Sequence, residues 1–151
     1  MKQLNEIIYD AIMADEDLVA AVGGAEQVEN TCFEVSPLAD ADNTPVPYLL
    51  VMNDGFQNNL TTKDTVWEGE EDDVQATVEI AGRDPGEVEQ LLKAVRRAVE
   101  RHIVSLYQQG ADTPQLQSLQ AAQLQWDWTK PCYFQHLTYS CTIKNEDDEQ
   151  E

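Results

Sequence analysis

The chain has 151 residues, which suits a single domain and is enough to enclose a hydrophobic core. It carries 29 acidic residues against nine Lys and Arg, so its formal net charge is −20 at pH 7. Such a surface repels DNA, RNA and anionic lipids, which argues against a conventional nucleic-acid-binding protein. No apolar run approaches the roughly 20 residues that span a bilayer, and the N-terminus lacks the apolar core of a signal peptide. We therefore expect a cytosolic protein without membrane contact.

The N-terminal segment predicts two short helices. Apolar residues at positions 4, 7, 8, 11 and 12 form one stripe of an amphipathic helix. Asp15 is a typical N-cap for a second helix. Gly23 and Gly24 would end this helix, because glycine readily adopts the left-handed conformation found there.

Three strands are predicted next. Residues 31–35 are β-branched and aromatic, and residues 48–53 form a second apolar run after a proline-containing loop. Residues 55–73 are polar and acidic, which predicts a projecting loop, either an arm or an extension of a hairpin. Residues 74–80 then alternate apolar and polar side chains, as in a strand with one face on a core.

The strongest helix signal begins at Asp84. Asp84 as N-cap, Pro85 at the first helical position and Glu87 three residues after the cap form a capping-box start. The helix is predicted over residues 85–109, with an apolar stripe on one side that includes His102, which we expect to be a hydrogen-bonded core histidine. Two charged pairs at i, i+4 spacing lie opposite the stripe: Glu89 with Lys93, and Arg96 with Glu100.

Two final strands complete the predicted fold. The first covers residues 122–128, with Leu124, Trp126 and Trp128 on one face, and the second covers residues 137–143. The order α-α-β-β-β-α-β-β predicts an α+β class, with a mostly antiparallel sheet of about five strands and helices packed on one face. We expect one domain over residues 1–144 and a disordered acidic tail at 145–151.

Residues 68–73, with the sequence EGEEDD, are the densest acidic cluster before the tail. They contain five carboxylates: Glu68, Glu70, Glu71, Asp72 and Asp73. Their spacing does not match an EF-hand, which needs acids at alternate positions and a glutamate at the twelfth. A weak cation site, a repulsive surface and a solvated approach to the next strand remain open as interpretations.

Neither a metal site nor an active site is predicted. Cys132, His136 and Cys141 offer only three ligands, and Cys141 lies on the other face of the strand from the other two. The sequence contains no Ser-His-Asp spacing, GxSxG elbow, Walker loop or HExxH motif. We therefore expect no enzymatic activity, no metal and no cofactor.

Four of the nine basic residues gather on one side of the long predicted helix: Lys93, Arg96, Arg97 and Arg101. One interpretation is a solvated helix face with local i, i+4 pairs, each of which contributes a few tenths of a kcal/mol. The other is an interface, because a basic stripe on an acidic protein can meet an acidic surface of another copy.

Four segments, taken in order, resemble a known family. They are LNEIIYDAIMADEDLVAAVGG, PVPYLLV, VQATVEIAGRDPGEVEQLLKAVRRAVERHI and YFQHLTYSCTI, and together they span residues 4–143. The pattern resembles the tail-completion proteins of long-tailed bacteriophages and prophages, similar in architecture to the tail terminators represented by lambda minor tail protein U. The acidic insertion at 55–73 and the acidic tail depart from that pattern.

The resemblance implies a structural role in virion assembly and head-tail joining. Copies would form a homo-oligomeric ring, expected to be a hexamer, that caps the tail tube and binds the tail-tube protein and the head-side connector. DNA would pass through without specific binding, and acids at 68–73 would line the lumen or rim, or belong to an arm that orders on assembly. The protein would assemble in the host cytoplasm and remain in the virion at the head-proximal end of the tail.

A second function fits the composition from a different class. A small acidic protein can mimic DNA and inhibit a nucleic-acid-binding protein by occupying its basic groove. Oligomeric state separates the two functions, because a DNA mimic acts as a monomer or dimer whereas a terminator assembles with itself or with the tail tube.

Overall fold

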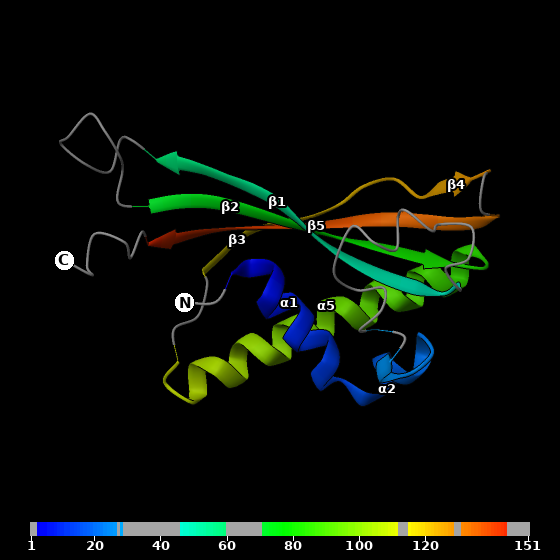
Figure 1. Ribbon diagram of the computed structural model, residues 1–151, viewed down its shortest axis with the longest axis horizontal. Helices are drawn as coiled ribbons and strands as arrows, with labels where there is room; N and C mark the ends of the chain where they lie inside the picture. Colours follow the sequence, from blue (N-terminus) through cyan, green and yellow to red (C-terminus); the bar gives the residue numbers. More distant parts are fainter. Residues whose placement is uncertain are drawn as a thin grey trace.

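The computed structural model describes residues 3–26, 28, 46–59, 71–111, 115–128 and 131–144. Within these ranges the chain forms a five-stranded sheet in which every pairing is antiparallel, and the helices lie on one side of it (Figure 1). The predicted α+β class is therefore confirmed. The predicted strand at 31–35 and the acidic tail at 145–151 lie outside the described residues.

Two helices open the fold as the sequence predicts. Helix α1 spans Leu4–Ala14, and every apolar residue of its predicted stripe is buried. Helix α2 spans Glu16–Ala21 and begins at Asp15, whose carboxylate accepts a hydrogen bond from the Leu18 backbone N–H at 3.1 Å. No helix in the described ranges is long and apolar enough to cross a membrane.

Strands β1, Tyr48–Asn59, and β2, Glu71–Gly82, form a hairpin that is longer than predicted. The ladder shifts register between Asn53 and Phe56, where Gly55 has a φ of 89° and donates its N–H to the Asn53 side chain at 2.9 Å. It then continues to the pair Asn59 and Glu71. The two ends of the acidic segment 55–73 are thus strand rather than loop, and residues 60–70 lie outside the described part of the chain.

Helix α5, Pro85–Gln108, packs beneath the sheet and begins at the predicted residues. Asp84 accepts from the Glu87 backbone N–H at 2.8 Å, and the Glu87 side chain accepts from the Arg83 backbone N–H at the same distance. The Arg83 guanidinium also contacts Glu87, at 2.9 Å, and this hydrogen bond holds the pKa of Glu87 below its usual range. The capping arrangement fixes the point where α5 leaves β2.

Three strands follow α5: β3, Gln115–Ala121, β4, Gln125–Asp127, and β5, Cys132–Lys144. The sheet order is β1-β2-β5-β3, with β4 also paired to β5. The predicted strand at 122–128 is wrong in its bounds, because only Gln125–Asp127 is strand, and β3 lies where no strand was predicted. The two tryptophans of this segment lie at the surface: Trp126 is 36% exposed and Trp128 is 87% exposed. Trp126 packs edge-on against Tyr133, with ring centroids 4.7 Å apart.

The core lies between the sheet and helices α1 and α5. The sheet supplies a continuous apolar face to it: Leu49, Val51, Ala76, Val78, Ile80, Leu137, Tyr139 and Cys141. The first four turns of α5 supply Val88, Leu91, Val95 and Val99, as its stripe predicts. His102, in contrast, is only half-buried, so the expected core histidine is wrong.

Candidate functional site

The sheet face that looks away from the helices is polar. Alternation along β2 and β5 places Gln75, Thr77, Thr138 and Ser140 on this face, opposite the apolar residues of the core. Thr77 and Thr138 lie within hydrogen-bond distance of each other, at 3.0 Å, and so do Ser118 and Ser140, at 2.5 Å. We call this surface the open face. Its polar groups hydrogen-bond to one another, whereas toward the start of β1 the same side of the sheet carries the buried residues Leu50, Ala81 and Cys132.

One carboxylate organises the end of the open face near the start of β1. Glu79 accepts a hydrogen bond from the Tyr48 hydroxyl at 2.7 Å and lies 2.9 Å from Nε2 of His136. Burial and the hydrogen bond to Glu79 raise the pKa of Tyr48 above its usual value, so this phenol stays neutral. The cluster joins β1, β2 and β5 and acts as a structural clamp.

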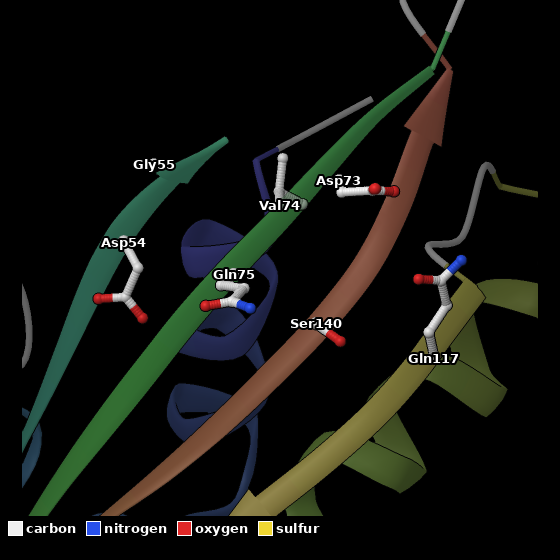
Figure 2. A pocket seen from close by; sticks show the side chains of 7 residues that line it. All are labelled: Asp54, Gly55, Asp73, Val74, Gln75, Gln117 and Ser140. Carbon is white, nitrogen blue, oxygen red and sulfur yellow. The ribbon is translucent and has the colours of Figure 1, made fainter. Parts of the chain in front are cut away.

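At the other end, four strands enclose an acidic hollow of about 430 Å³ (Figure 2). Its lining contains two carboxylates, three other polar side chains, one glycine and one apolar side chain: Asp54, Gly55, Asp73, Val74, Gln75, Gln117 and Ser140. Asp54 accepts from the Thr77 hydroxyl at 2.5 Å, and Asp73 accepts from the Thr142 hydroxyl at 2.9 Å. The Thr142 hydroxyl also accepts a hydrogen bond from the side-chain amide of Gln117. Among the described residues, no Lys or Arg lines the hollow, so the field of these residues repels anions.

The predicted acids are only partly brought together. Asp73 lines the acidic hollow, whereas Asp72, the residue before it on β2, lies toward the opposite face and is half-buried. Glu71 starts the strand, and Glu68 and Glu70 lie outside the described residues. Asp54, which sequence reasoning did not single out, completes the hollow because the hairpin register brings it beside β2. Among the described residues, no group of three or more His, Cys, Asp or Glu could hold a metal ion.

The predicted basic stripe is divided by the surroundings of α5. Lys93 forms the expected ion pair with Glu89, at 3.2 Å. Arg97 and Arg101 line a hollow between α2 and α5, together with Asp15 and Asp17 of the same molecule. Arg96 lies on the other flank of the helix, toward β3. The four bases are exposed, but they do not form one uniform surface.

A groove between α5 and β3 was not predicted from the sequence. It holds about 310 Å³ and is lined mainly by apolar side chains: Arg96, Val99, Glu100, Ile103, Val104, Leu116, Leu119 and Tyr139. We call it the α5–β3 groove. Leu116 and Leu119 share its side of β3 because the register shifts between Leu116 and Ser118. The signal in the sequence was the pair of leucines within an otherwise polar segment.

Comparison with known proteins gives a fold relationship. No family model matches the chain, and no curated protein sequence matches it either. Among solved structures, it is similar to a chain of the "Virion of native gene transfer agent (GTA) particle", with a TM-score of 0.53 and 15% sequence identity. The match covers 93% of this chain and 94% of that chain, so the two share one fold along nearly their whole lengths.

Proposed function

We propose that this chain is a structural protein of a phage-like virion, and specifically a tail terminator. The observation that carries the proposal is the shared fold with a chain of a gene transfer agent particle, over 93% of the present chain. The resemblance of its sequence pattern to tail-completion proteins points the same way. Copies form a ring, expected to have six members, that caps the tail tube and joins the tail to the head.

The open face suits the wall of a channel through which DNA passes. Asp54 and Asp73 line its acidic hollow and Glu79 lies farther along it, and no Lys or Arg from the described ranges lines the hollow. A basic wall would hold the DNA backbone by releasing its counterions, whereas an acidic wall lets phosphates slide past. In the proposed role the protein contacts the tail-tube protein and the head-side connector, binds no DNA specifically and needs no catalytic activity.

The test is assembly of the purified chain, alone and with the tail-tube protein encoded beside it. We expect light scattering after size exclusion to find a species larger than a dimer, and negative-stain microscopy to show rings with a central hole. Mobility-shift assays at low salt should find no binding of duplex DNA. A chain that stays monomeric under all these conditions, and that displaces DNA from a nucleic-acid-binding protein, would contradict the terminator role and favour a DNA mimic.

A further inference from the structure

The α5–β3 groove leaves large apolar side chains open on the surface of a very acidic protein. Val104 is 49% exposed, Leu116 36% and Leu119 39%, and Tyr107 extends the same side of α5 at 76%. Single exposed apolar residues are ordinary, but a group of them around a groove commonly marks an interaction site. The side chains come from two elements, α5 and β3, so the groove is preformed by the fold.

Tyr139 gives the groove a polar group without a partner. The residue is 2% exposed, and its hydroxyl has no hydrogen-bond partner among the described residues. Burial raises the pKa of Tyr139 to about 12, so the hydroxyl remains a neutral donor. A buried hydroxyl without a partner is destabilising, and native proteins usually satisfy such groups. Arg96 lines the same groove and supplies a positive charge beside it.

The charge around the groove differs from that of the rest of the chain. Helix α5 carries four bases and three acids, and β3 carries no charge at all. The whole chain carries nine bases and 29 acids. Two copies therefore repel each other over most of their surfaces, and the flank of α5 and β3 is where a second acidic copy can approach.

Strand β3 adds a second feature that favours docking. Within the described part of the chain it pairs only with β5, so its outer edge is not covered by another strand. It contains neither the charges nor the proline that commonly protect edge strands from pairing with another chain. Its edge can thus support a segment that places a side chain in the groove.

From these observations we propose that the α5–β3 groove is the docking surface for a neighbouring copy of this chain, which inserts an apolar side chain and sets a carboxylate against Tyr139 and Arg96. The inference rests on the proposed function, in which copies assemble. It goes further by assigning the interface to Arg96 and the groove, and not to the basic stripe as a whole. Arg97 and Arg101 instead lie beside the acids of their own α2.

Two adjacent arginines provide the first test. Arg96→Glu and Arg97→Glu change the charge equally at two exposed positions of α5, but only Arg96 lines the groove. By light scattering, we expect Arg96→Glu to raise the protein concentration needed for assembly at least tenfold. Arg97→Glu should change this concentration less than threefold. Circular dichroism checks that both variants fold. Equal effects of the two substitutions would overturn the assignment to the groove.

Neighbouring positions of β3 provide an independent test of the apolar part. Leu119 pairs with Tyr139 on the groove side, whereas Gln120 pairs with Thr138 on the open face, and both are exposed. Leu119→Glu should abolish the larger species, and Gln120→Glu should leave it intact. If folded Leu119→Glu protein assembles like the wild type, the groove is not the interface.

Tyr139→Phe tests the unpartnered hydroxyl. A hydroxyl that serves only the monomer would leave assembly unchanged when removed, which would overturn the proposed carboxylate contact. We expect the dissociation constant of assembly to rise about tenfold while the monomer keeps its melting temperature or gains a little. The failures are distinguishable: a wild type that never assembles contradicts the terminator role as well, whereas variants that all assemble contradict only the groove.

Discussion

The two faces of the sheet are built from the same strands and differ in almost every other respect. The inner face is a continuous apolar surface covered by α1 and α5. Over most of its length the open face presents threonines, serines, glutamines and carboxylates, several of which hydrogen-bond to one another. The inner face holds the fold together through burial, and the open face presents a charged surface to whatever passes or binds there.

Tyr139 and the α5–β3 groove lie where this division ends. The inner face continues beneath β3, but α5 leaves part of it uncovered, so Leu116 and Leu119 remain partly exposed. An apolar strip at the boundary of a covered face is where a second molecule can extend the core. The covered inner face thus stabilises the fold, and its uncovered margin beside β3 is the surface for interaction.

The largest effect should come from placing a charge on the inner face. Leu137→Asp would bury an unpaired carboxylate at a site that is 1% exposed, at a cost of roughly 4 kcal/mol or more. Because small domains have only ~5–15 kcal/mol of total stability, we expect an unfolded or barely folded protein. Gln120→Asp, one rung away on the open face, should stay within about 0.5 kcal/mol of the wild type in urea titrations. Similar losses of stability for both variants would show that the two faces of the sheet tolerate a charge equally.

Gly82, at the end of β2, lies against the first turn of α5. A Cβ at this position would lie 2.9 Å from Cγ2 of Val88 and 3.1 Å from its backbone nitrogen. We expect Gly82→Ala to cost roughly 1–3 kcal/mol, because the backbone of α5 cannot move aside without disturbing the core. A double-mutant cycle with Val88→Ala should give a favourable coupling energy, since the smaller side chain relieves one of the two contacts. Additive losses of stability would show that the strain in Gly82→Ala does not come from contact with the Val88 side chain.

On the open face, the clamp at Glu79 should have a smaller influence. Glu79→Gln keeps the shape but removes the charge that Tyr48 and His136 face, and we expect a loss of about 1–2 kcal/mol of stability near neutral pH. Tyr48→Phe, which removes only one of the two contacts, should lose less. Chemical denaturation of the three proteins checks the ranking. If Glu79→Gln left the free energy of unfolding unchanged, the open face would contribute nothing to the fold.

The smallest effect concerns alkaline pH. Burial raises the pKa of Tyr139 from 10.0 to about 12, so the folded state keeps a proton that the unfolded state loses. The contribution of Tyr139 is complete below pH 10 and is lost as the pH rises toward 12, about 1 kcal/mol by pH 11. Stability of the dilute monomer should therefore fall less steeply between pH 9 and 11 in Tyr139→Phe than in the wild type. Parallel curves would show that the phenol is not shielded from water.

Several local features follow from the sequence alone. The α1 stripe, the Asp15 cap and the Asp84–Glu87 capping arrangement are all present as predicted. These features depend on residues within one or two turns of each other, so local spacing and hydrogen-bonding chemistry determine them. The alternation at 74–80 predicted which side of β2 meets the core for the same reason.

The positions of the acidic hollow and of the bases on α5 depend on the tertiary structure. Asp54 and Asp73 meet because the register of the β1–β2 hairpin sets them across the acidic hollow, and no local pattern fixes that register. The four bases of α5 are separated because α2 packs on one flank and β3 on the other. Strand β3 lacks the regular apolar–polar alternation of a strand with one buried face, and it forms because β5 offers it a partner. Contacts between distant segments depend on how the elements pack, which is a property of the whole chain and not of any single stretch.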